Sequence, residues 1–223
     1  NLETNFNKLD LFIDSKPGGQ NKLRGDNPNV DFNGLNRMGD DGSGNGLRFD
    51  AGFESDYFLM YTGGNTGSGI QYFSNFAETN TSGGGAGAFI GGSANNSTLI
   101  NGSNGIVLVA DQSNTLGVNV LSAPFDSDPA TVQTGVEIAI PLSVIGNPTG
   151  DIHITAFVNG GGHDFLSNQF LGPLPQGTGN LGEPRNVNLS QLAGNQFFTV
   201  VVPEPSAVGL AGFLTGALLR RRR

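Results

Sequence analysis

Residues 41–46 have the composition of a calcium-binding loop. They offer side-chain oxygens at alternate positions and a glycine in sixth place: Asp41, Ser43, Asn45 and Gly46. Hard cations are wrapped by oxygen ligands at this spacing, with a glycine at the sharp turn. The twelfth position holds a glycine instead of the usual glutamate, so Asp40, Asp50 or Glu54 would have to complete the site. We take Asp41, Ser43, Asn45 and Asp50 as the candidate ligands. The alternative is a Gly/Asn-rich turn between strands.

A second candidate chemistry is stacking against a sugar ring. Five aromatic residues lie in two neighbouring segments: Tyr57, Phe58, Tyr61, Tyr72 and Phe73. Aromatic residues on strands usually belong to the core. Among the five, Tyr61 and Tyr72 are the candidates for an exposed glycan-binding face.

The sequence offers no evident set of catalytic residues. His163 follows three glycines, where a histidine could act as a ligand or a base, but the sequence has no cysteine and no Gly-x-Ser-x-Gly nucleophile motif. Glycoside hydrolysis needs two carboxylates facing each other across a cleft. The six glutamates offer no evident pair. The sequence therefore predicts a protein that is not an enzyme.

The sequence predicts that short strands position these residues. Apolar residues alternate in several segments and are separated by Gly, Asn and Ser clusters, which is typical of strands and turns. Strands are expected at 8–14, 47–53, 57–61, 70–76, 106–110, 116–121, 135–140, 151–158 and 196–202, with 82–92 either a loop or a strand. A short helical turn is expected after Pro141. Such spacing predicts an all-β fold, an antiparallel β-sandwich with long loops.

Composition and charge narrow the function classes. The chain has 223 residues, 36 glycines, 16 phenylalanines and no cysteine, so disulfides and thiolate chemistry are excluded. Residues 1–202 carry seven basic and eighteen acidic side chains, a net charge of −11. An acidic body without a basic stripe should be repelled by nucleic acid, and we exclude nucleic acid as a partner.

Three pieces of the body resemble CBM9-like and DOMON-like sandwiches, which include jelly-roll carbohydrate-binding modules. They are Phe12-Ile13-Asp14, the Val-Glu-Ile-Ala-Ile-Pro strand at 136–141, and a later strand leading into Ser167-Asn168-Gln169. The resemblance spans residues 8 to about 175 and implies a β-sandwich that binds carbohydrate or a cofactor. The chain departs from the sugar-binding members of this family because it has no tryptophan.

The last 21 residues resemble a PEP-CTERM sorting signal, which exosortases read in Gram-negative bacteria. Pro203-Glu204-Pro205 interrupts regular structure, 14 uncharged residues follow, and the chain ends on Arg220, Arg221, Arg222 and Arg223. As a helix, the uncharged run would span about 21 Å and could hold the tail transiently in a membrane. The arginines would stay on the cytoplasmic side.

The resemblance implies two parts, a β-sandwich domain at 1–202 and the sorting signal at 203–223. It implies export, transient membrane anchoring, cleavage by an exosortase-type enzyme, and a place in the cell envelope or the extracellular, exopolysaccharide-rich matrix. Residues 1–5 do not look like a signal peptide, so we expect the native N-terminus to lie further upstream. The expected function is a non-enzymatic surface protein that binds polysaccharide. The alternatives are an exported polysaccharide-acting enzyme and a purely structural matrix protein.

Overall fold

The structure is a computed structural model that describes residues 2, 4–113, 133–172 and 174–202. Within these residues ten strands form two antiparallel sheets, accompanied by one short α-helix and three 3-10 turns. The predicted all-β, sandwich-like architecture is confirmed.

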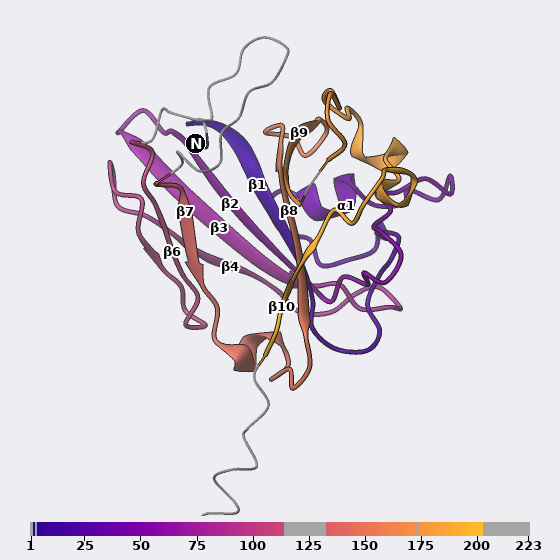
Figure 1. Cartoon of the computed structure of the whole chain (residues 1–223). Coiled ribbons are helices and arrows are strands. Elements are labelled where there is room, and N and C mark those ends of the chain that lie inside the picture. The colour runs from indigo at the N-terminus through magenta and orange to yellow at the C-terminus, as the bar shows by residue number, and fades with distance from the viewer. Residues whose placement is uncertain (1, 3, 114–132, 173, 203–223) are drawn as a thin grey trace, which may run out of the picture.

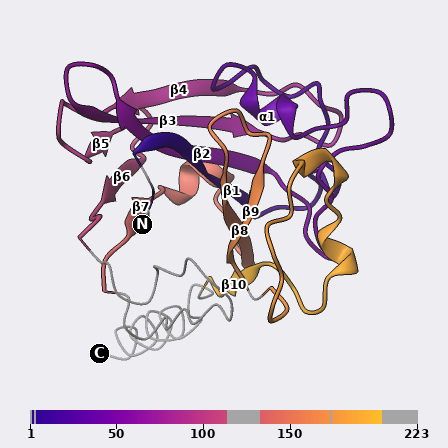
Figure 2. The same cartoon turned by 90° about the horizontal axis from the view of Figure 1, so that it is seen from above.

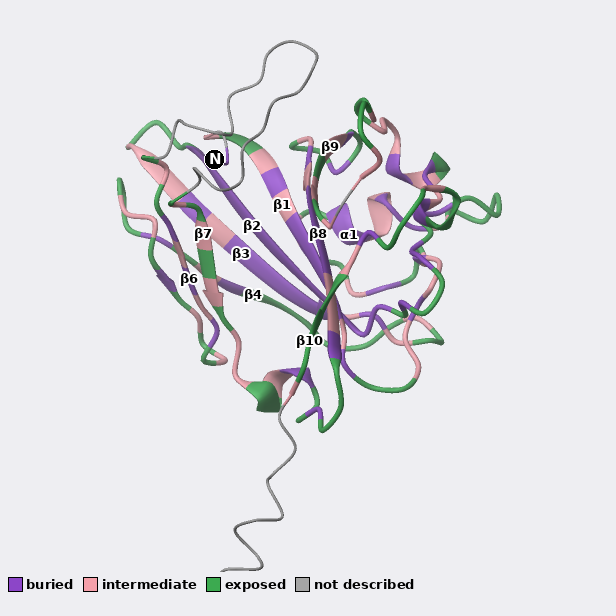
Figure 3. Cartoon of the chain, in the orientation of Figure 1, coloured by how far each residue is buried: buried purple, intermediate pink, exposed green. Residues whose placement is uncertain are grey.

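The larger sheet carries the site. Its strand order is β10-β8-β1-β2-β3-β4, and β9 also pairs with β8 (Figure 1). The strands are β1 (Asn5–Asp14), β2 (Tyr57–Asn65), β3 (Ile70–Glu78), β4 (Gly87–Gly92), β8 (Ile152–Asn159), β9 (Leu166–Leu171) and β10 (Phe198–Val200). The central strands are purple along much of their length in Figure 3, because both faces of this sheet are covered.

The smaller sheet has the order β5-β6-β7. Its strands are β5 (Ile100–Asn101), β6 (Val107–Ala110) and β7 (Val136–Ala139). The 3-10 turn η2 (Leu142–Ile145) follows β7 directly after Pro141, as the sequence predicts. Proline ends the strand there because it has no backbone N–H for the ladder.

Alternation along β1 divides the residues between two cores. Leu9, Leu11 and Ile13 face the smaller sheet and pack with residues such as Ile100 and Leu108. The intervening residues face the other way, where Phe12 belongs to a second core. Successive side chains of a strand point to opposite faces, so one strand supplies both cores.

The second face of the large sheet is covered by an irregular layer instead of strands. It contains α1 (Gly34–Arg37), η3 (Pro184–Asn186) and η4 (Leu189–Gln191), and Figure 2 shows α1 and β5–β7 on different sides of the sheet. The predicted strand at 47–53 was wrong. Leu47 and Phe49 are buried as its alternation requires, but Arg48 makes only isolated bridges to the loops around it.

Most other predicted strands occur with shifted ends. The hairpin of β2 and β3 extends further than expected, so that Gly63, Gly64 and Asn65 are paired strand residues and the loop is shorter. The ambiguous glycine-rich segment forms β4. The predicted strand at 116–121 and the predicted C-terminal hydrophobic helix lie outside the described residues. Among the described residues, no helix combines the length and hydropathy needed to cross a membrane.

Candidate functional site

An open cavity of about 390 Å³ lies where the irregular layer meets β1 and the β8–β9 hairpin. Its walls come from three segments that are far apart in the sequence: Lys8 of β1, residues 31–37 around α1, and residues 161–163 of the hairpin, with Arg185 at one side. We call it the Phe32 pocket. Its floor is charged and buried, and its edge carries an exposed aromatic ring.

A buried ion cluster forms the floor. Lys8 Nζ lies 2.9 Å from Asp31 Oδ2, and His163 Nε2 lies 2.7 Å from the same oxygen. The other ring nitrogen, His163 Nδ1, lies 3.0 Å from Asp10 Oδ2, which also accepts a hydrogen bond from Asn159 Nδ2. The four charged side chains are at most 7% exposed. Two cations and two carboxylates therefore balance inside the protein, as buried charges must.

His163 is the centre of this cluster. Burial alone would lower its pKa, but the charge of Asp10 and hydrogen bonds to Asp10 and Asp31 outweigh burial and raise the pKa to about 9. Burial would raise the pKa of Asp31, but hydrogen bonds from His163 and Lys8 prevail and hold this pKa below its ordinary value. At neutral pH the imidazole is therefore a cation that donates from both nitrogens.

Residues 31–33 form a left-handed turn at the edge of the pocket. Their φ angles are 45°, 54° and 69°, and Gly34 N donates to Val30 O at 3.1 Å to close the turn. L-residues rarely adopt this conformation, and consecutive examples are rarer still. The turn leaves the Phe32 side chain 102% exposed. His163 has a φ of 54°, so four strained residues share one pocket. Such strain clusters at functional sites.

Several neighbouring contacts hold this turn in its left-handed conformation. Asp31 is fixed by the ion cluster, and Asn33 Oδ1 accepts a hydrogen bond from Asn36 Nδ2 at 2.8 Å. Asn36 in turn exchanges two hydrogen bonds with the backbone of Asn27. Gly34 packs so closely on the imidazole that a Cβ atom there would lie 2.2 Å from His163 Cδ2. The position of Phe32 is therefore set by residues that are themselves held in place.

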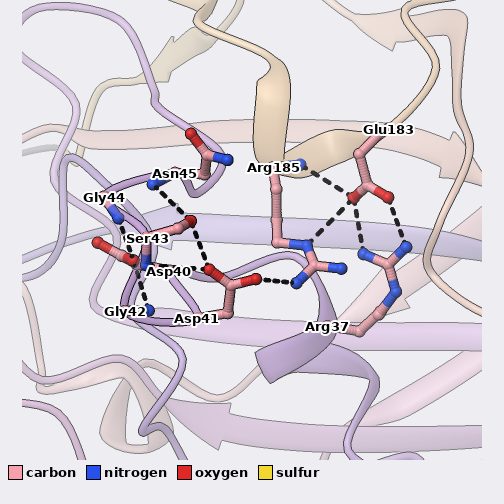
Figure 4. Close-up of polar contacts among 9 residues, drawn as sticks. All are labelled: Arg37, Asp40, Asp41, Gly42, Ser43, Gly44, Asn45, Glu183 and Arg185. Atoms are coloured by element: carbon pink, nitrogen blue, oxygen red, sulfur yellow. Dashed lines mark hydrogen bonds and ion pairs between the residues drawn. The ribbon is translucent and has the colours of Figure 1, made fainter.

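A chain of ion pairs forms one side of the pocket (Figure 4). Arg37 binds both carboxylate oxygens of Glu183 through its two terminal nitrogens. Arg185 Nε also lies 3.4 Å from Glu183, and Arg185 Nη1 lies 2.7 Å from Asp41 Oδ2. The Arg37 hydrogen bond lowers the pKa of Glu183 to about 2, so this carboxylate stays charged. Both arginines line the pocket, whereas Glu183 and Asp41 are not among its lining residues.

Of the predicted calcium ligands, Asp41, Ser43 and Asn45 lie together in one loop. Figure 4 shows that Asp41 accepts from Ser43 and from Arg185, and that Asp40 caps the backbone of Gly42 and Gly44. The fourth candidate, Asp50, is buried and accepts from Gln196 N at 2.6 Å. No group of three or more His, Cys, Asp or Glu is placed to hold a metal among the described residues. The loop is a turn held by internal hydrogen bonds and cations, and the calcium ligand set stays a prediction.

The predicted glycan face does not form at Tyr61 and Tyr72. Both side chains are buried, at 0% and 3% exposure, and their rings stack on each other at 5.2 Å. Tyr61 Oη donates to Thr98 O at 2.8 Å, and burial raises the pKa of Tyr61. They pack between the two sheets, so neither ring face is open to a sugar.

Sequence reasoning singled out His163 but not its partners. Asp10 and Lys8 lie two residues apart on β1 and share a face, whereas Asp31 and His163 are 132 residues apart. The signal that was overlooked is Asn33-Gly34, a turn dipeptide directly after an aromatic residue. The sorting-signal residues Pro203, Glu204, Pro205 and Arg220 to Arg223 lie outside the described residues.

Comparison of the chain with protein-family models, with curated proteins and with solved structures found no match. The resemblances to PEP-CTERM proteins and to CBM9-like sandwiches therefore stay predictions.

Proposed function

We propose that this protein is an exported bacterial surface or matrix protein whose body binds polysaccharide in the Phe32 pocket. The observation that carries the proposal is the fully exposed Phe32 ring, held on a strained left-handed turn beside a polar cavity. A flat apolar ring next to fixed polar groups suits a sugar, which has an apolar C–H face and a rim of hydroxyls.

The polar groups that would meet the hydroxyls come from side chains and backbone. Asn33 and Arg37 line one wall, and Gly161 and Gly162 line another. The glycines leave backbone groups accessible because they have no side chain. A volume of about 390 Å³ is in the range of small-molecule sites, so the pocket can take one or two sugar units of a chain.

The chemistry of the floor favours binding over hydrolysis. A glycosidase needs one carboxylic acid that is protonated at the working pH. Asp31 is instead held ionised by His163 and Lys8, and Asp10 is bound to the other nitrogen of the same imidazole. These two carboxylates serve to fix His163 and the turn, which supports a protein that recognises a saccharide without cleaving it.

The sorting signal supports the cellular setting. In this proposal an exosortase-type enzyme removes the tail near Pro203-Glu204-Pro205 after transient membrane anchoring, and the body reaches the cell envelope or the extracellular matrix of a Gram-negative bacterium. An acidic body with a net charge of −11 suits a surface facing water, away from nucleic acid.

The test is a glycan array probed with the full chain, followed by calorimetric titration of the glycans that bind. Phe32→Ala should weaken binding about fivefold, because loss of a stacking ring costs on the order of 1 kcal/mol. Phe89→Ala is the matched control: Phe89 is also exposed but lies on β4, away from the pocket, and its loss should leave affinity unchanged.

Equal affinity of the Phe32→Ala variant and the unchanged protein would contradict the proposed site. Failure to bind any glycan would contradict the function. Shortening of a bound oligosaccharide, followed by chromatography, would show that the protein is an enzyme.

A further inference from the structure

Basic side chains are scarce in the body and concentrate in the Phe32 pocket. Residues 1–202 contain seven lysines and arginines against eighteen acidic residues. Three of the seven line this pocket, namely Lys8, Arg37 and Arg185, and the His163 imidazolium is a fourth cation there. Asp31 is the only acidic residue among the described residues that line the cavity. The pocket is therefore unlike the rest of this acidic protein.

The two arginines are held by carboxylates that do not line the cavity. Glu183 takes two nitrogens of Arg37 and one of Arg185, and Asp41 takes Arg185 Nη1. Within the described part of the chain, Arg185 Nη2 and Arg37 Nε have no hydrogen-bond partner. A guanidinium has five N–H donors in one plane, so each arginine keeps donors for a ligand after its internal pairs are made.

The donors are also partly withdrawn from water. The side chains of Arg37 and Arg185 are 31% and 24% exposed. Reduced contact with water strengthens a charge-assisted hydrogen bond, and a planar guanidinium matches the two oxygens of a carboxylate. Asp10, Asp31, Glu183 and Asp41 balance the four cations in formal charge, so the pocket offers an anion its free N–H groups and not a net positive charge. The paired carboxylates also restrain the arginines, which reduces the entropy lost on binding.

We propose that the saccharide bound in the Phe32 pocket is acidic, with a uronate carboxylate held by Arg185 and Arg37 while its ring stacks on Phe32. This inference rests on the proposed function and names its ligand class. Neutral sugars would leave the guanidinium donors to water, whereas a uronate would pair with them.

The experiment compares each acidic oligosaccharide with its own methyl ester. The full chain is titrated with trimers of galacturonate, mannuronate and glucuronate and with the corresponding esters, at 20 mM and 500 mM NaCl. For at least one sugar, the acid should bind at least tenfold more tightly than the ester at low salt, and the difference should shrink at high salt. A sulfated neutral trimer tests whether any anion suffices, and it should bind more weakly than the best uronate.

Variants separate charge from stacking. Arg185→Gln should reduce the preference for the acid over the ester and leave affinity for the ester unaffected, whereas Phe32→Ala should weaken binding of both. Arg185→Lys keeps the positive charge but lacks the planar guanidinium, so its affinity for the acid should lie between those of the unchanged protein and Arg185→Gln. Arg24→Gln is the matched control, because Arg24 is an exposed arginine paired with Asp26 outside the pocket.

The outcomes distinguish the two proposals. If acid and ester bind equally, or if only neutral glycans bind with dependence on Phe32, the acidic ligand is wrong and the saccharide site stands. If no glycan of any kind binds, both proposals fail. The comparison of acid with ester uses the unchanged protein, so it decides the question even where a variant does not fold.

Discussion

At the scale of single residues, His163 is the side chain on which the site depends most. It links Asp10 of β1 to Asp31 of the left-handed turn, and it supports Gly34 at the start of α1. An imidazolium can do this because both ring nitrogens donate, whereas a neutral imidazole would donate from one nitrogen only. The charge state of one histidine therefore connects the sheet to the pocket.

The first prediction concerns pH. The pKa of His163 is raised from about 6.5 to about 9 on folding, so its stabilising contribution is fully present below pH 6.5 and is lost as pH rises through 9. The loss should be on the order of 3 kcal/mol. Denaturant unfolding at pH 6, 8 and 10 measures it.

His163→Asn tests the assignment, because asparagine tolerates the positive φ at this position. At pH 6 the variant should be about 3–5 kcal/mol less stable than the unchanged protein, since Asp10 and Asp31 lose their shared partner. The gap should narrow by pH 10. A gap that is constant with pH would show that the imidazole is not charged.

At the scale of elements, the pocket depends on how closely α1 approaches the β8–β9 hairpin. Gly34 is the contact point, because its backbone lies against the His163 ring. A helix of four residues has little stability of its own, so this packing and the clamps on the preceding turn must hold it.

The prediction at this scale is that Gly34→Ala destabilises the protein and loosens the pocket. The added Cβ would lie 2.2 Å from His163 Cδ2 and 2.4 Å from Nε2, so the ring must move away from Asp31. Overpacking of this kind costs about 1–3 kcal/mol. Thermal unfolding and saccharide titration should both show the effect.

Gly150→Ala is the matched control. An added Cβ there meets no atom within 4 Å, and Gly150 has no positive φ, so the change should be nearly neutral. If both alanine variants were equally stable and bound saccharide equally, the close packing of α1 on the hairpin would not matter for the site.

At the scale of the whole molecule, the body and the tail have opposite charge. The body is strongly acidic, and the chain ends on four arginines after a long uncharged run. In our proposal the two parts have different roles: the tail serves membrane anchoring and processing, and the body binds saccharide. Removing the tail should therefore leave the saccharide site intact.

The corresponding prediction is made in a Gram-negative host that has an exosortase-type enzyme. The full chain, carrying a secretion signal of the host, should be recovered without the residues that follow the 203–205 triplet, as measured by intact mass. Glu204→Ala should leave the tail attached, because the triplet is the expected recognition element. Glu54→Ala, an exposed glutamate of the body, should be processed normally. Normal processing of the Glu204→Ala variant, or an intact tail on the unchanged protein, would contradict the sorting signal.

The sequence by itself determined the fold class and most of the strands. Alternation of Leu9, Leu11 and Ile13 identified β1, and Pro141 marked the end of β7, because these signals are local and have a period of two residues. The strand expected at 47–53 failed for a related reason: alternate burial also arises in an irregular segment that packs on a sheet.

Only the tertiary structure decided which candidate residues meet. The sequence pattern around Tyr61 and Tyr72 fits an exposed strand face as well as a buried one. The two rings are buried because the second sheet covers them. Lys8, Asp31 and His163 come from segments up to 155 residues apart in sequence, and no local pattern records that sheet pairing and a left-handed turn bring them within 3 Å. The calcium-like loop has the right spacing, but Asp41 already accepts hydrogen bonds from Arg185 and from the backbone of Ser43. Spacing along a chain specifies local geometry, whereas a site is made by long-range packing.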